Sequence, residues 1–120
     1  MSDNFDWSEA LRAVKGDPTL LKVIMQTFLE ETPHLVERIR TAIARGDGPA
    51  LKIAAHSLKG SFRYLGIAPA FEQAFRLEKM GQEGNLANCQ EVLEDLQGQI
   101  TQIVPAVSQY LQHGDAGTAG

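Results

Sequence analysis

Hydrophobic residues recur at steps of three and four along most of the chain, which is the period of a helix with one buried face. The clearest stretch covers residues 51–65, and its predicted core positions are Leu51, Ala54, Ala55, Leu58, Phe62 and Leu65. A second regular stretch near the C-terminus carries Leu86, Cys89, Leu93, Leu96, Ile100, Ile103, Val107 and Tyr110. No strand-like alternation between hairpin turns competes with this pattern, so the chain is predicted to be all-α.

Prolines and glycines divide this pattern into segments. Four of the five prolines stand where a first helical turn would begin, because the N–H that proline lacks is not needed there: Pro18, Pro33, Pro49 and Pro69. Left-handed residues that end a helix are expected at Gly46, Gly66 and Gly81. The fifth proline, Pro105, lies inside the last segment and is expected to kink that helix rather than end it. Short links between such helices predict an antiparallel four-helix bundle, with a short additional N-terminal helix from residues 6–14 across one end.

The 120 residues form one predicted domain, with the bundle over residues 1–112 and a small, polar and glycine-rich tail over residues 113–120 that we expect to be disordered. The single cysteine, Cys89, excludes an internal disulfide and is expected in the core. No apolar run is long enough for a membrane span, and no charged-then-apolar leader follows Met1. We therefore expect no membrane insertion and a cytoplasmic location, either as a free-standing protein or as a soluble piece of a larger one.

The charge distribution is more informative than its sum. The net charge of −4 argues against nucleic acid as a partner, because phosphate backbones require clustered cations over a broad surface. Residues 48–71 contain no aspartate or glutamate, although the chain has 15 of them. This gap coincides with the helix predicted over residues 51–65, and it favours an anion-binding surface there.

His56 lies on the water side of that helix, roughly 150° from the centre of the hydrophobic stripe at about 100° per residue. The same exposed side is predicted to carry Lys52, Lys59, Gly60 and Arg63. An exposed imidazole among cations is suited to hold an anion. As ordinary solvated side chains, these cations would need no further explanation.

Gly60 is harder to explain by stability alone, since glycine inside a helix costs about 0.5–1 kcal/mol relative to alanine. On an exposed face, its bare backbone would let another protein approach His56 closely. The other two histidines are expected to be ordinary surface residues. His34 completes a Glu31-x-x-His34 spacing known from di-iron bundles, but no second such pair is present, and His113 lies in the predicted tail. We expect no metal site.

The segment His56-Ser57-Leu58-Lys59-Gly60, followed by Leu65-Gly66, resembles the signature of the histidine-containing phosphotransfer (HPt) domain of phosphorelays. The resemblance extends over nearly the whole chain. It includes Phe5-Asp6-Trp7, Gly16-Asp17-Pro18, Phe28-Leu29-Glu30, Ala44-Arg45-Gly46-Asp47 and Leu77-Glu78.

The resemblance implies a four-helix bundle whose exposed histidine accepts a phosphoryl group from a receiver-domain aspartate and passes it to another receiver. His56 would be the acceptor, through Nε2. Lys59 would steady the phosphate and Gly60 would give clearance, while Lys52 and Arg63 would add positive charge or contact the partner. Further receiver contacts are expected at Trp7, Leu11 and Tyr64, although for Trp7 and Leu11 the alternative is simple capping of the core.

The same resemblance implies a phosphocarrier without kinase activity of its own. It would need no cofactor, because the Mg²⁺ and most of the catalysis would belong to the receiver. The expected partners are response-regulator receiver domains, and a hybrid sensor kinase if the chain is its C-terminal domain. We expect a monomer.

Two alternatives use the same helical face. One is a docking module that binds a receiver or another partner without phosphotransfer. The other is the histidine domain of a chemotaxis kinase, which predicts further regulatory and nucleotide-binding domains downstream. An autokinase dimerisation domain fits less well, since its histidine is typically followed by an acid and here Ser57 follows.

Overall fold

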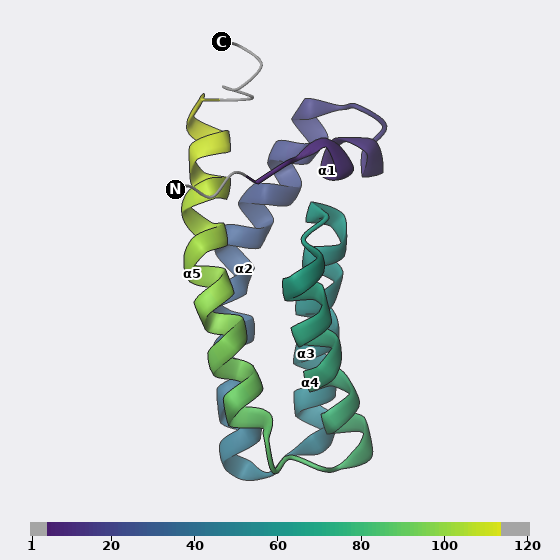
Figure 1. Cartoon of the computed structure of the whole chain (residues 1–120), viewed down its shortest axis with the longest axis vertical. Coiled ribbons are helices and arrows are strands. Elements are labelled where there is room, and N and C mark those ends of the chain that lie inside the picture. The colour runs from purple at the N-terminus through teal and green to yellow at the C-terminus, as the bar shows by residue number, and fades with distance from the viewer. Residues whose placement is uncertain (1–4, 114–120) are drawn as a thin grey trace.

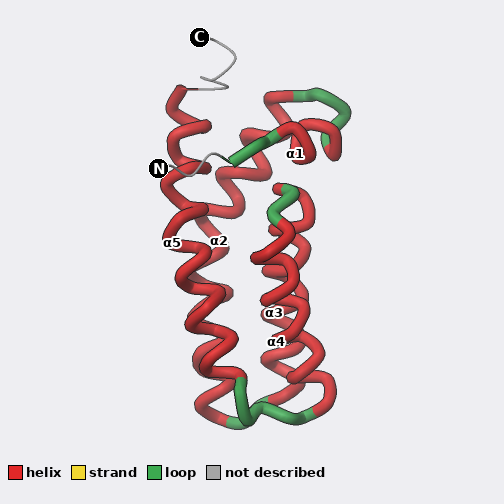
Figure 2. Tube along the Cα trace, viewed as in Figure 1, coloured by secondary structure: helices red, strands yellow, loops and turns green. Residues whose placement is uncertain are grey.

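The computed structural model describes residues 5–113, which contain five α-helices and no strand (Figures 1 and 2). The helices are α1 (Ser8–Ala13), α2 (Pro18–Arg45), α3 (Gly48–Leu65), α4 (Ala68–Glu83) and α5 (Cys89–His113). The four long helices run antiparallel to their neighbours along the chain, and α1 lies across one end of them (Figure 1). The predicted all-α bundle with a short N-terminal helix is confirmed. Within residues 5–113, no helix combines the length and the apolar character that crossing a membrane requires.

The local signals for helix starts and ends hold at most of the predicted places. The Asp17 carboxylate accepts hydrogen bonds from the backbone N–H groups of Thr19 and Leu20 at 3.0 and 3.3 Å, and Pro18 follows it as the first residue of α2. Asp47 caps α3 in the same way. Both Gly46 and Gly66 end their helices in the left-handed conformation, with φ of 65° and 71°.

The predicted helix start at Pro33 is wrong, because α2 runs through this proline without a break. Its ring lacks the N–H that would bond to the carbonyl of Leu29, which is a local cost. The residues on either side nevertheless continue one buried stripe, with Phe28, Thr32 and Leu35 all facing the core. Burying that stripe outweighs the missing bond. Pro105 likewise lies inside α5, where the helix continues as expected.

The ends of α5 differ slightly from prediction. The helix begins at Cys89, and Leu86 packs half-buried in the preceding connection. It ends at His113, the first residue of the predicted tail, and the rest of that tail, residues 114–120, lies outside the described part. Cys89 is buried as expected, and this burial raises the pKa of its thiol.

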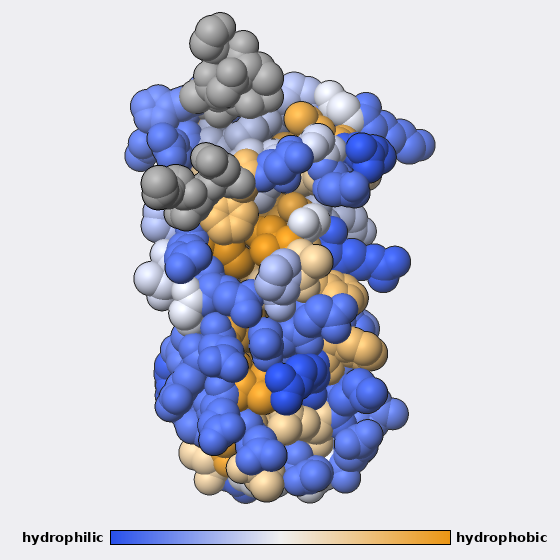
Figure 3. All heavy atoms as spheres, in the orientation of Figure 1, coloured by the Kyte–Doolittle hydropathy of each residue, from blue (hydrophilic) through white to orange (hydrophobic). Residues whose placement is uncertain are grey.

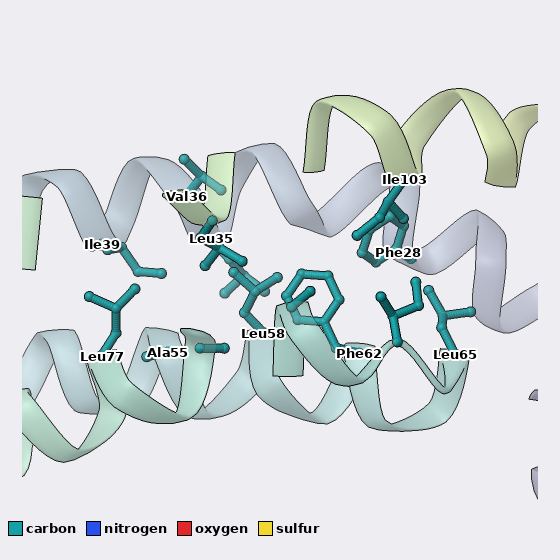
Figure 4. Close-up of a cluster of buried hydrophobic side chains, with 14 of the residues drawn as sticks. Phe28, Leu35, Val36, Ile39, Ala55, Leu58, Phe62, Leu65, Leu77 and Ile103 are labelled. Carbon is teal, nitrogen blue, oxygen red and sulfur yellow. The ribbon is translucent and has the colours of Figure 1, made fainter. Parts of the chain in front are cut away.

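The core runs along the axis of the bundle. Figure 4 shows side chains from α2 meeting those of α3, α4 and α5, with the rings of Phe28 and Phe62 5.8 Å apart. All six predicted core positions on α3 are buried, with at most 3% of their surface exposed. On the face seen in Figure 3, hydrophobic residues show mainly in the seam between α5 and the α3–α4 pair.

The prediction that Gly81 ends a helix is wrong, because α4 continues to Glu83 and is closed by Gly84. Gly81 is instead the point where α4 passes very close to α3. A Cβ built on Gly81 would lie 2.6 Å from the backbone oxygen of Gly48 and 2.7 Å from the backbone nitrogen of Lys52. The glycine is needed for close helix packing rather than for a turn.

We expect Gly81→Ala to destabilise the bundle by about 1–3 kcal/mol, because the atoms that it meets are backbone and cannot move aside. Gly98→Ala is the matched control, since a Cβ on this α5 glycine meets no atom within 4 Å. That variant should gain about 0.5–1 kcal/mol from helix propensity. Urea unfolding measures both. Equal stability of the two variants would contradict the close α3–α4 contact.

Candidate functional site

His56 lies near the middle of α3 with 66% of its side chain exposed, on the side opposite the core stripe as predicted. Its Nδ1 lies 2.9 Å from Oε2 of Glu78, which projects from α4. A carboxylate oxygen accepts hydrogen bonds, so Nδ1 carries the proton in this pair. In the neutral ring, Nε2 is then the unprotonated nitrogen, with its lone pair available.

Lys59 is bound to the other oxygen of the same carboxylate. Its Nζ lies 2.7 Å from Glu78 Oε1 and 4.9 Å from the centre of the Phe75 ring, and only 18% of the side chain is exposed. The prediction that Lys59 stands on the open face is therefore wrong. Because α4 packs against this side of α3, the lysine lies in the seam between the two helices.

The Glu78 carboxylate is largely covered, with 12% of its side chain exposed. Burial by itself raises the pKa of Glu78, but the hydrogen bonds from Lys59 and His56 outweigh it and hold the pKa below its ordinary value. The carboxylate is therefore ionised at neutral pH. It fixes the orientation of the imidazole, and it would stabilise a positive charge on that ring.

The other predicted cations are placed differently. Both Lys52 and Arg63 are exposed, and within residues 5–113 neither forms an ion pair with Glu78 or a hydrogen bond with His56. In place of the expected ring of cations, the site has one ordered lysine, Lys59, and two exposed cations at its edge, Lys52 and Arg63. The sequence analysis also missed the anion at the centre of the site.

His56 has two unlike sides. At about 100° per residue, Lys59, Lys52 and Arg63 fall about 20–60° from His56 toward α4. Small and apolar residues fall about 40–100° the other way, toward α2, and these are Ile53, Ser57, Gly60 and Tyr64. On the charged side α4 covers Lys59 but leaves Lys52 and Arg63 exposed, whereas the α2 side is open beside Gly60.

Gly60 is half-buried, and a Cβ built on it meets no atom within 4 Å. Nothing inside the fold therefore requires a glycine there. A shallow hollow of about 410 Å³ lies beside it between α2 and α3, with Val23, Thr27, Ser57 and Tyr64 among its lining residues. Tyr64 is 55% exposed.

The two predicted contacts in the N-terminal segment lie at the end of the bundle. Trp7 stacks on Phe5 at 5.7 Å and meets Tyr110 edge-on at 6.3 Å, and both Trp7 and Leu11 pack half-buried against the core. Gly66, at the end of α3, touches α1. Ten residues separate Gly66 from His56, about 15 Å along the helix axis. Trp7 and Leu11 thus have the placement expected of core-capping residues.

Glu78 and Phe75 are the site residues that sequence reasoning did not single out. Nothing in the pattern of α3 points to them, since both come from the next helix. The only signal was the Leu77-Glu78 pair within the family resemblance. Elsewhere, His34 is exposed, and no group of three or more His, Cys, Asp or Glu side chains in the described residues could hold a metal ion.

The family model described as the Hpt domain matches residues 23–109. The chain belongs to the Hpt domain family. Hpt domains are phosphocarriers rather than catalysts, and this Hpt domain is a histidine phosphotransfer intermediate of a phosphorelay. Such domains interact with receiver domains and hybrid kinases. The matched region contains the whole His56 site but not α1.

Solved structures have the same fold as this Hpt domain. Histidine-containing phosphotransfer protein B from Pseudomonas aeruginosa PAO1 is 20% identical and has a TM-score of 0.81, with 94% of this chain and 98% of that one covered. The HPT domain of a sensor hybrid histidine kinase from Shewanella is also 20% identical, with a TM-score of 0.82 and coverage of 92% and 96%. No curated protein matches the sequence.

The Glu78 contacts predict a pH-dependent stability. Its pKa in the folded Hpt domain lies below that of the unfolded chain, so its contribution is complete above about pH 4.3 and is lost as the pH falls through the folded pKa. We expect Glu78→Gln to be less stable than the native chain by on the order of 1 kcal/mol at pH 7. The difference should shrink toward zero below pH 4.3.

Urea unfolding across that pH range measures this difference. Glu72→Gln is the control, because Glu72 is exposed on the same helix and forms no ion pair within residues 5–113. A Glu78→Gln deficit that stays constant down to acid pH would show that the carboxylate charge is not what the two cationic groups stabilise.

Proposed function

We propose that His56 is the phosphoacceptor of this Hpt domain and that the phosphoryl group is carried on Nε2. One observation carries the proposal: Glu78 holds Nδ1 at 2.9 Å, while the ring remains 66% exposed on the open side of α3. This leaves Nε2 as the free nucleophile. Gly60, one turn later, leaves the space beside it open to a partner.

In the proposed step, the Nε2 lone pair attacks the phosphorus of an aspartyl phosphate on the receiver. The N–P bond forms as the bond between phosphorus and the aspartate oxygen breaks, and the aspartate leaves as a carboxylate. The Nδ1 proton stays on the ring, which therefore gains positive charge. Glu78 stabilises this charge at hydrogen-bond distance, as preorganised dipoles and charges do in other transfer sites. Transfer to the next receiver is the same step in reverse.

Lys59 supplies positive charge next to the site of the phosphoryl group. It is held by Glu78 on one side and by the Phe75 ring on the other, so its ammonium needs little reorganisation when the phosphoryl group arrives. The chain contributes the acceptor, its orienting carboxylate and this cation. The Mg²⁺ of the reaction and most of the catalysis are assigned to the receiver.

The receiver is proposed to dock over α2 and α3. Five large hydrophobic side chains are exposed in the described chain, and four of them lie on these two helices: Leu20, Val23, Ile53 and Tyr64. Val23 and Tyr64 line the hollow beside Gly60, and Ile53 lies one turn before His56 on its open side. An exposed apolar surface around a reactive group is typical of a protein-binding site. This placement favours Tyr64 as a partner contact over Trp7 and Leu11, which lie half-buried at the end of the bundle.

The first test is transfer itself. The protein and its His56→Gln variant are incubated with phosphorylated receiver domains and Mg²⁺, and acid-labile, base-stable phosphate is located by mass. We expect the label on His56 in the native protein and none in the variant, with Nε2 identified as the bonded nitrogen by NMR. A folded native protein that takes no label from any receiver in the panel would favour the docking-module alternative.

Gly60→Ala tests the need for clearance. We expect the variant to be about 0.5–1 kcal/mol more stable, because alanine is the better helix residue and its Cβ meets nothing in the fold. Phosphotransfer should nevertheless slow severalfold through a higher KM for the receiver. Gly98→Ala, on α5, should gain similar stability and transfer normally. If Gly60→Ala also transferred normally, the glycine would have no role in docking.

A further inference from the structure

A second hollow, which we call the basic groove, lies between α2 and α3 nearer the junction of these two helices. Its volume is about 520 Å³. The lining residues that matter here are His34, Arg38, Thr41, Arg45, Ala50 and Ile53. Its alanines have short side chains, so a partner's side chains could enter between the two helices. The contacts among His56, Lys59 and Glu78 do not involve this groove.

The groove is lined by two arginines and two acids, and they differ in whether they already have partners. It contains two acids, but each is already engaged: Glu37 forms an ion pair with Arg40 at 2.6 Å, and the Asp47 carboxylate caps α3 through the Ala50 N–H at 3.1 Å. Arg38 and Arg45 form no ion pair within residues 5–113. The groove therefore presents two guanidinium groups that have no ion-pair partner in the described residues, and guanidinium groups match carboxylates through paired hydrogen bonds.

The basic groove is continuous with the proposed receiver face. Ile53 lines the groove, is 67% exposed and lies one turn before His56 on the open side of α3. At the other end of that face, Gly60 and Tyr64 line the apolar hollow. A typical interface covers about 800 Å² on each partner. A protein that reaches His56 from the α2 side is therefore wide enough to cover both hollows.

We propose that the basic groove is the specificity half of the docking face and that it binds a carboxylate-bearing edge of the receiver domain. This inference rests on the proposed function, because it assumes that the partner seated over His56 is a receiver. The apolar half around Tyr64 would provide contact area. The arginine pair would select receivers with acids at the facing position and would speed association with them.

Charge favours this occupant over others. Two copies of a chain with a net charge of −4 repel each other, and this overall repulsion disfavours self-association. Nucleic acid binding depends on many cations spread along a surface, whereas the groove offers two. A folded partner with local acids, brought in by the adjoining His56 face, satisfies both conditions.

The test uses the full chain with the variant Arg38→Glu/Arg45→Gln. The second change is to glutamine, because an acid at the last residue of α2 would oppose the helix dipole. The control is Lys22→Glu/Arg76→Gln, which makes the same change in net charge. Both control residues are exposed, and Lys22 lies about 200° around α2 from Leu20, away from the docking face.

Two quantities are measured with a panel of receiver domains at 50 mM and 500 mM salt: the Kd of each receiver for the unphosphorylated protein, and kcat and KM for phosphotransfer. For receivers that bind the native protein, we expect the groove variant to raise Kd and KM about tenfold at low salt, with kcat unchanged. At high salt the loss should fall below twofold, because screening removes the attraction. The control should change Kd less than twofold.

The inference would be overturned by equal Kd values for the native and groove-variant proteins, or by an equal loss of affinity in the control variant. It would also be overturned if no receiver bound the native protein, or if sedimentation showed that the native protein self-associates through these arginines. Binding is measured separately from transfer, so the two proposals can fail separately. Binding that depends on the arginines, without label on His56, would contradict the phosphoacceptor role and support the groove proposal. Label on His56, with binding that does not depend on the arginines, would support the phosphoacceptor role and contradict the groove proposal.

Discussion

The close contact between α3 and α4 is the constraint on which the site depends. Where the helices cross near Gly48 and Gly81, their backbones approach more closely than any side chain would permit. The same antiparallel pairing brings Glu78 alongside His56, one carboxylate oxygen on the imidazole and the other on Lys59. A site made of three side chains from two helices therefore depends on packing two turns or more away from the histidine.

The Glu78 carboxylate has a double effect on the histidine. By accepting from Nδ1, it decides which ring nitrogen is free, and by remaining ionised it would favour the positively charged ring that the proposed phosphorylation creates. Lys59 limits this effect, since it shares the carboxylate and brings a compensating charge to the place where the phosphoryl group would lie. The effect of Glu78 on the imidazole therefore depends on its contact with Lys59 as well as on its contact with His56.

The two flanks of His56 differ in their chemistry. Toward α4 the histidine meets the charged network that bears on its chemistry, and toward α2 it meets open backbone, exposed hydrophobic side chains and the basic groove. If the receiver docks on the α2 side as proposed, residues there can vary without disturbing the contact between His56 and Glu78. The core beneath, which joins Phe28 to Phe62, is common to both flanks and keeps α2 and α3 in register.

The sequence by itself determined the helical class, the core stripe of α3 and the outward position of His56, because helical periodicity and capping are local properties. It also marked Gly60 as a glycine without a packing reason. Only the tertiary structure decided that the helices continue through Pro33 and Gly81. Whether a proline breaks a helix, or a glycine ends one, depends on what the neighbouring residues bury. The tertiary structure also decided the place of Glu78, for the pattern along one helix carries no information about which side chain the next helix brings to it.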